Sequence, residues 1–364
     1  MKVLFVTMDG GGNLPPAVGI AHEVERRGGS ASFLGNAVQR AGIEGAGLRF
    51  RPFVEGRDYD SSAPRSTLKG VADLTGLFAD RRIGRDALAL IAESPVDAVI
   101  VDCLLWGATL ELTRAGVPVV SLVHSQWQYF RGNARGPVGL ISRLRGADPV
   151  RAEAAARIAL VATRPEVEDP AGFAPPASVA HTGFVWQGRP VAARSNDRPR
   201  VLVSFSTTSF PGQARALQNV LDALDGLPVD IVATTGAVDP TTLRIPHGAR
   251  VERRIDHDEL LPTTRLVIGH GGHATTSRAL AHGIPLLVMP MHPLMDQPAI
   301  ARAVERLGVG RHLPKSTSPA RIRAAVHELL VDDAVLGRAR VLGEDIRSQD
   351  GAVVAVDILS SVVE

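Results

Sequence analysis

Residues 269–278, with the sequence GHGGHATTSR, combine residue types that could bind an anion. They follow an apolar run at 266–268 that predicts a buried strand, and a helix is expected to begin at His273. The first turn of a helix has free N–H groups and the positive end of the helix dipole. Gly271 and Gly272 allow the backbone to approach a ligand closely. This segment therefore predicts a phosphate-binding site.

Side chains in the same segment add hydrogen-bond donors. His270 follows the expected strand, and Thr275 and Thr276 fall in the expected first helical turn. Arg278 would share a helix face with Thr275. A cation so close to a helix N-terminus is slightly unfavourable unless an anion binds there. Arg278 is therefore either a ligand of the anion or a side chain that points into solvent.

These residues must be positioned by alternating strands and helices. From residue 3 onward, short apolar runs alternate with helical patterns, which predicts parallel sheets covered by helices on both faces. The alternation breaks at 186–199, a polar stretch, and begins again at residue 200. We expect an α/β protein of two Rossmann-like, doubly wound domains that face each other across a cleft. Their expected bounds are 1–188, a linker at 189–199, 200–345, and a C-terminal helix at 346–364 that packs on the first domain.

One long segment does not fit this alternation. Residues 50–82 have weak periodicity and many turn-forming residues, so we expect mostly loop there.

Composition argues against several classes of protein. The chain has 364 residues and a formal net charge of +2, without a stripe of Lys and Arg interleaved with aromatics, so nucleic-acid binding has no support. The single cysteine, Cys103, allows no internal disulfide framework or thiolate metal cluster and fits a reducing cytoplasm. The longest apolar run, 96–112, contains three acidic residues and is too polar for a membrane span. We expect a cytoplasmic protein without a membrane partner.

Residues 269–297 resemble the donor-binding signature of the inverting, metal-independent glycosyltransferases of the GT-B fold (family one, natural-product type). The resemblance extends more loosely over most of the chain. It implies that the second domain binds a dTDP- or UDP-sugar and that the first binds a hydrophobic acceptor such as an aromatic polyketide or a macrolide. It also implies a single displacement with inversion and no cofactor besides the sugar nucleotide.

The predicted donor ligands combine this resemblance with the pattern of the segment itself. The ligands of the donor diphosphate are predicted to be His270, Gly271, Gly272, His273, Thr275, Thr276 and Arg278. Those of the donor sugar are predicted to be Asp296, Gln297, His292, Ser206 and Thr207. Residues 253–261 match the loop that cradles the nucleobase.

Two positions depart from the family. It usually has a glutamate, which accepts the ribose hydroxyls, where this chain has Arg278, and its Asp–Gln pair usually comes earlier than Asp296 and Gln297.

Glycosyl transfer to a hydroxyl needs a general base, and the histidine that usually supplies it is replaced here by Asn13. Asp102 and His124 each follow a predicted strand and should lie at the same sheet edge. Asp102 is our first candidate for the base and His124 the second, with Asn13 as a positioning group. The structural alternative is that Asp102 caps a helix and His124 packs internally. Oxygen attack is expected, with carbon attack kept open because the usual histidine is missing.

Four aromatic residues of the first domain are candidates for an apolar acceptor pocket, and helix packing is the alternative for each. They are Trp106, Trp127, Tyr129 and Phe130.

No metal is expected. Two Asp-x-Asp sequences, at 58–60 and 256–258, are interpreted as ordinary surface carboxylates. A homodimer is kept open. Two other functions are kept as alternatives: a sugar-nucleotide 2-epimerase on the same architecture, and a non-catalytic sugar-nucleotide-binding protein that lacks the usual base.

Overall fold

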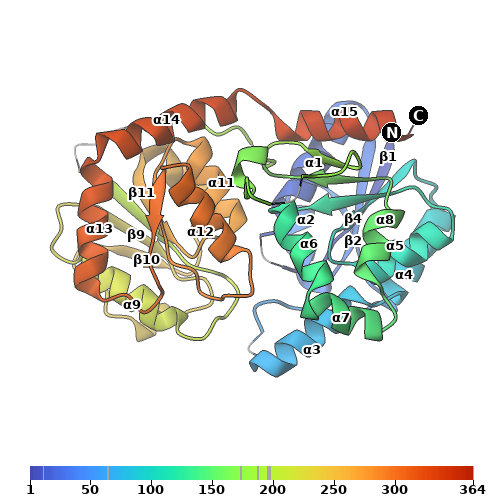
Figure 1. Ribbon diagram of the computed structural model, residues 1–364, viewed down its shortest axis with the longest axis horizontal. Helices are drawn as coiled ribbons and strands as arrows, with labels where there is room; N and C mark the ends of the chain where they lie inside the picture. The colour runs from blue at the N-terminus through green and yellow to red at the C-terminus, as the bar shows by residue number, and fades with distance from the viewer. Residues whose placement is uncertain (11, 64, 173, 187, 195–197, 364) are drawn as a thin grey trace. The chain divides into compact units, whose positions relative to one another are not determined.

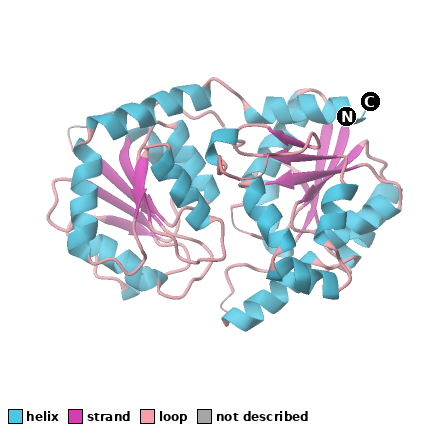
Figure 2. Ribbon diagram, viewed as in Figure 1, coloured by secondary structure: helices cyan, strands magenta, loops and turns pink. Residues whose placement is uncertain are grey.

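A computed structural model describes residues 1–364 except 11, 64, 173, 187, 195–197 and 364, so part of the expected linker at 189–199 lies outside the described residues. The chain divides into two compact α/β units (Figure 1). The first unit comprises Met1–Gln187 together with Asp350–Glu364, and the second comprises Gly188–Gln349. In each unit a sheet lies between layers of helices (Figure 2). Both units are Rossmann-like, as the sequence predicts.

The first unit has a parallel sheet whose described strands follow the order β3-β2-β1-β4-β5-β6-β7. The strands are β1 (Lys2–Val6), β2 (Ser30–Gly35), β3 (Arg49–Pro52), β4 (Ala98–Asp102), β5 (Val119–Val123), β6 (Ile158–Val161) and β7 (Val179–His181). The helices are α1 (Leu14–Arg26), α2 (Arg40–Gly45), α3 (Thr67–Phe78), α4 (Arg82–Glu93), α5 (Trp106–Arg114), α6 (Trp127–Arg135), α7 (Pro137–Leu144), α8 (Pro149–Ala155) and α15 (Gly351–Val363).

The core of this unit forms around β1. Phe5 lies opposite Phe33 of β2 and Ile100 of β4, and the rings of Phe5 and Phe33 stack at 4.8 Å. Apolar residues of α15, including Val356 and Leu359, are buried in the same cluster. Figure 1 shows α15, in red, alongside α1. The last helix of the chain therefore completes the core of the first unit.

The second unit repeats the scheme with the strand order β10-β9-β8-β11-β12-β13, again parallel among the described residues. The strands are β8 (Arg200–Ser204), β9 (Asp230–Thr234), β10 (Arg250–Glu252), β11 (Thr264–Gly269), β12 (Leu286–Val288) and β13 (Gly310–His312). The helices are α9 (Gln213–Leu224), α10 (His257–Leu260), α11 (His273–Ala281), α12 (Gln297–Arg306), α13 (Pro319–Val331) and α14 (Asp333–Arg347).

The expectation of mostly loop at 50–82 is wrong, because α3 occupies 67–78. The hydroxyl of Ser66 caps this helix by accepting a hydrogen bond from the Lys69 N–H. Leu77 and Phe78 bury its apolar face in the core of the first unit. Tertiary packing thus stabilises a helix whose sequence pattern is weak.

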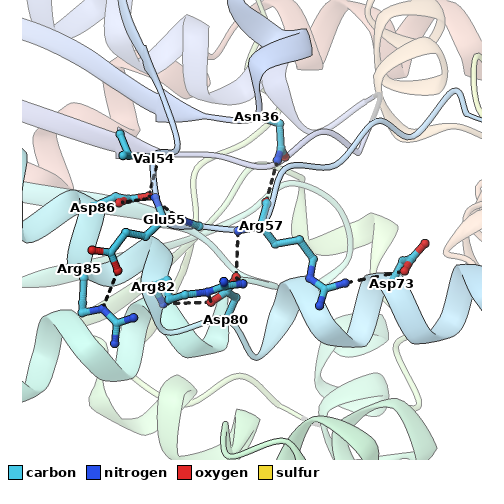
Figure 3. A network of polar contacts seen from close by, with 10 residues as sticks. Asn36, Val54, Glu55, Arg57, Asp73, Asp80, Arg82, Arg85 and Asp86 are labelled. Atoms are coloured by element: carbon cyan, nitrogen blue, oxygen red, sulfur yellow. Dashed lines mark hydrogen bonds and ion pairs between the residues drawn. The ribbon is translucent and has the colours of Figure 1, made fainter.

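The segment before α3 is irregular but firmly held (Figure 3). The carboxylate of Asp86, on α4, accepts hydrogen bonds from the N–H groups of Val54, Glu55 and Gly56 at 2.9–3.0 Å. Asp80 accepts the N–H of Arg57 at 2.9 Å. Buried carboxylates replace a strand partner here, so these backbone N–H groups are satisfied without regular structure.

Candidate active site

Three neighbouring strands of the first sheet bring Asn13, Asp102 and His124 together. Asn13 follows β1 and begins α1, Asp102 is the last residue of β4, and His124 follows β5. Asn13 Nδ2 donates to Asp102 Oδ2 at 2.7 Å, and His124 Nδ1 lies 3.4 Å from the same oxygen. The three residues meet at the carboxyl edge of the sheet, where ligands of such folds bind.

Asp102 is a buried carboxylate that accepts two hydrogen bonds and faces His124. Besides the Asn13 amide, the N–H of Leu104 donates to its Oδ1 at 3.0 Å. Burial alone would raise the pKa of Asp102, but His124 and the two hydrogen bonds outweigh that effect and lower the pKa. Asp102 is therefore ionised at neutral pH.

The amide of Asn13 is fully engaged. Its Nδ2 also donates to the carbonyl oxygen of Met8 at 2.9 Å, and its Oδ1 accepts the N–H of Gly10 at 3.1 Å. These bonds fix the orientation of the side chain, and an amide has no basic nitrogen. Asn13 can therefore orient Asp102 but cannot accept a proton.

His124 is held on two sides. Its Nδ1 is buried and faces Asp102, and the Phe130 ring meets the imidazole edge to face, with centroids 4.8 Å apart and planes inclined by 66°. The side chain keeps 15% of its surface exposed, compared with 5% for Asp102.

The predicted phosphate-binding segment of the second unit contains two glycines that its backbone requires. Gly271 has φ +83°, and a Cβ there would lie 2.8 Å from Val288 Cγ1. Gly272 is the N-cap residue of α11, and a Cβ there would lie 2.6 Å from His270 Nε2. Side chains are therefore excluded where the backbone turns into α11, which leaves the N–H groups of its first turn accessible to an anion.

His270 lies between the end of β11 and this helix. Its Nδ1 is buried without a hydrogen-bond partner among the described residues. Burial lowers the pKa of His270 to about 4, and the nearby Ser204 backbone opposes this only weakly. The imidazole is therefore neutral at pH 7 and can donate one N–H to an anion.

Other predicted diphosphate ligands have different environments. His273 and Thr276 are buried, and Thr275 is half-buried in the first turn of α11. The guanidinium of Arg278 does not simply point into solvent, because it forms an ion pair with Asp258 at 3.2 Å, and its role as a diphosphate ligand stays a prediction. A carboxylate thus already neutralises the cation that we expected to bind phosphate or to point into solvent.

The residues predicted to contact the donor sugar lie in two loops of the second unit. Gln297 Oε1 accepts the N–H groups of Met291 and His292 at 2.7 and 3.2 Å, so its carbonyl organises the loop between β12 and α12. Asp296 is the N-cap residue of α12. In the other loop, the Ser206 hydroxyl accepts the Thr208 N–H at 3.0 Å, while Thr207 is exposed.

Comparison with known proteins finds similarity to glycosyltransferases of natural-product biosynthesis. The model of the erythromycin biosynthesis protein CIII-like C-terminal domain matches residues 218–360. The 4'-demethylrebeccamycin synthase of Lentzea aerocolonigenes is 28% identical, over 100% of this chain and 99% of that protein. The demethyllactenocin mycarosyltransferase of Streptomyces fradiae is 32% identical, over 46% of this chain and 36% of that protein. The solved structure of the glycosyltransferase VinC in complex with dTDP is 17% identical, with a TM-score of 0.75 over 100% of this chain and 99% of that one.

The chain is a glycosyltransferase with the GT-B fold, and the relatives to which it is similar are natural-product glycosyltransferases. The family resemblance of residues 269–297 is thereby confirmed. No helix in the described part of this glycosyltransferase is long and apolar enough to cross a membrane.

The aromatic residues predicted to line an acceptor pocket divide into two groups. Trp106 is buried in the core of the first unit, edge to face with Phe78 at 5.3 Å, so the packing alternative holds for it. Trp127, Tyr129 and Phe130 belong to a smaller apolar cluster against which Cys103 packs, and the Phe130 ring contacts His124. Trp127 and Phe130 are themselves buried, and the role of these three residues in acceptor binding stays a prediction.

One set of possible metal ligands occurs among the described residues of the glycosyltransferase. Asp102, Cys103 and His124 each have a ligand atom within 4.8 Å of the others. Burial, aided by the charge of Asp102, raises the pKa of the Cys103 thiol well above its usual value. That the enzyme needs no metal stays a prediction.

Sequence reasoning missed a polar group beside the donor segment. His257 Nε2 lies 3.3 Å from the Ser204 hydroxyl oxygen. The same oxygen accepts a hydrogen bond from the Thr234 hydroxyl at 3.1 Å. Asp258, the partner of Arg278, follows directly on α10. The Asp-x-Asp sequence at 256–258 was the sequence signal that lies at this polar group. Its first aspartate, Asp256, caps α10 by accepting the Asp258 N–H at 2.9 Å.

Proposed function

We propose that the enzyme transfers a sugar from a dTDP- or UDP-sugar to a hydrophobic small molecule of the aromatic polyketide or macrolide type, with inversion at the anomeric carbon. The observation that carries this proposal is the segment at the start of α11, where Gly271 and Gly272 exclude side chains and His270 lies beside the helix N-terminus. Backbone N–H groups, the helix dipole and a neutral imidazole are complementary to a diphosphate leaving group. The dTDP in the VinC structure supports a nucleoside diphosphate as ligand.

In the proposed reaction, the acceptor hydroxyl attacks the anomeric carbon while the bond from that carbon to the diphosphate oxygen breaks. Negative charge then develops on the diphosphate, where His270 and the N–H groups of α11 stabilise it. Thr275 supplies a further donor, and Asp296 and Gln297 bind hydroxyls of the donor sugar. Oxygen attack is proposed first, because His124 and Asp102 form a histidine–carboxylate pair of the kind that can deprotonate a hydroxyl.

The acceptor would bind in the first unit, next to Trp127, Tyr129 and Phe130. Aromatic side chains beside a polar cluster suit a largely apolar ligand with one reactive hydroxyl. The relatives described above give no support to the epimerase or to the non-catalytic alternative.

The proposal is tested first by calorimetry. UDP or dTDP should bind to the enzyme, and the matching nucleoside monophosphate should bind at least about tenfold more weakly, because it has no β-phosphate for the α11 N-terminus. Gly272→Ala should weaken diphosphate binding by a similar factor, since the new Cβ would displace the His270 ring.

Gly337→Ala is the matched control. Gly337 lies within α14 and has open space around its Cα, so binding should be unchanged in this variant. Equal affinity of the wild-type enzyme for the mono- and diphosphates would contradict the proposed donor site. Mass spectrometry of incubations with sugar nucleotides and phenolic acceptors then tests whether the sugar is transferred.

A further inference from the structure

We infer that His124 is the general base of the enzyme and that Asp102 and Asn13 position it. This assignment rests on the proposed function and reverses the order in which the sequence ranked Asp102 and His124. Its geometric basis is a histidine–carboxylate pair assembled from two adjacent strands, β4 and β5.

The surroundings of Asp102 argue against its acting alone. Its Oδ2 accepts the Asn13 amide, its Oδ1 accepts the Leu104 N–H, and only 5% of the side chain is exposed. To accept a proton from an acceptor, Asp102 would have to give up charge-assisted hydrogen bonds inside the protein. Its surroundings also lower its pKa, which makes it a weaker base.

The orientation of His124 is that of a base. Its buried Nδ1 faces Asp102, so the exposed part of the side chain belongs to its other atoms. The two nitrogens of an imidazole lie on different edges of the ring. A proton on Nδ1, shared with Asp102, leaves the lone pair of Nε2 available. The edge of Phe130 restricts rotation of the ring.

Asn13 completes the arrangement from the third strand. Its amide donates to Asp102 Oδ2 and is itself fixed by Met8 and Gly10. The carboxylate is therefore held toward His124 by a neutral group, and the thiol of Cys103 is a further titratable group beside the pair. The histidine that the family usually has at Asn13 is thus replaced by one that follows β5, which is separated from β1 by β4.

The proton balance of the step is simple. His124 Nε2 takes the proton of the acceptor hydroxyl as the new bond from oxygen to the anomeric carbon forms. The electron pair of the breaking bond leaves with the diphosphate. The imidazolium that results is stabilised by the carboxylate of Asp102, and it returns its proton to solvent after product release.

The decisive experiment compares His124→Ala with His312→Ala. His312 pairs with Glu305 at 2.7 Å on the surface of the second unit and is a control for loss of a histidine–carboxylate contact. We expect His124→Ala to lower kcat by about 100-fold or more and His312→Ala to leave it unchanged. Added imidazole should restore part of the activity of His124→Ala and none to Asp102→Asn. His124→Ala with at least a third of the wild-type kcat would overturn the assignment, as would rescue of both variants or of neither.

A second measurement does not depend on turnover. Nitrogen-15 NMR of the histidine rings should find the His124 proton on Nδ1 and a bare Nε2 in the wild-type enzyme, and a changed ratio of tautomers in Asp102→Asn. A protonated Nε2 in the neutral ring would overturn the assignment even if no acceptor were found. If the proposed function itself is wrong, calorimetry will instead find that the wild-type enzyme does not bind UDP or dTDP.

Discussion

The two polar sites of the enzyme are built in opposite ways. The cluster in the first unit is made mostly of side chains around Asp102, which accepts the Asn13 amide and the Leu104 N–H and faces His124 at 3.4 Å. The donor segment in the second unit is made mostly of backbone, and His270 Nδ1 is buried without a hydrogen-bond partner among the described residues. The first site is assembled before any ligand arrives, whereas the second keeps its donors for the ligand.

This contrast has a physical reason. A general base must be oriented within a few tenths of an ångström, so a hydrogen-bonded network that fixes the ring is favourable. A site for a diphosphate needs unpaired N–H groups, and a helix N-terminus supplies them without additional side chains. Polar groups of the first kind stabilise the fold, and those of the second kind contribute mainly to binding.

The largest expected effect that tests this contrast is on stability. Asp102→Ala should lower the free energy of unfolding by about 3 kcal/mol, because it leaves the Asn13 amide and the Leu104 N–H without an acceptor. Urea denaturation checks this, with the exposed Asp225→Ala as a control that should change little. Since the pKa of Asp102 is lowered in the fold, its contribution is present above the unfolded pKa and lost as pH falls through the folded pKa. An unchanged unfolding free energy for Asp102→Ala would show that the polar groups of the first site do not stabilise the fold, and the contrast between the two sites would be wrong.

The next effect is on ligand binding at His270. His270→Ala should change the unfolding free energy by about 1 kcal/mol or less, because no hydrogen bond to Nδ1 is lost. It should weaken binding of UDP-glucose or dTDP-glucose by about tenfold.

Binding at His270 should also be linked to pH. The pKa of His270 is about 4 in the free enzyme, and a bound diphosphate must raise it. Between the two pKa values the complex holds more protons than the free enzyme, so affinity should increase as pH falls. Calorimetry in two buffers of different ionisation enthalpy measures the proton uptake. The same uptake in His270→Ala would show that another group is responsible.

The smallest effect is expected at the Arg278–Asp258 pair. Asp258 is half exposed, so the pair contributes little to stability. Arg278→Gln should change the unfolding free energy by less than about 0.5 kcal/mol and donor affinity by about threefold or less. Fluorescence titration with dTDP measures the affinity. A decrease of tenfold or more in dTDP affinity would instead identify Arg278 as a ligand of the diphosphate.

Local sequence patterns predicted much of this protein. The strand that begins at residue 200, the strand that includes 266–268 and the helix that begins at His273 lie where apolar runs and glycine breaks predicted them. The special role of Gly271 and Gly272 was also predicted, because a position that requires a residue without a side chain is visible in the sequence as a glycine. Helix α3 was missed, since its stability comes from packing rather than from a strong repeat of its own.

Only the tertiary structure decided which side chains meet. Asn13 and Asp102 are 89 residues apart, and their 2.7 Å hydrogen bond follows from the adjacency of β1 and β4 in the sheet. The same holds for the pairing of Arg278 with Asp258 and for the burial of Trp106 against Phe78. The sequence by itself determined the repeated strand–helix alternation and the glycine turn into α11, because these depend on neighbouring residues. The partners of each charge and ring depend on contacts between distant segments, which no local pattern records.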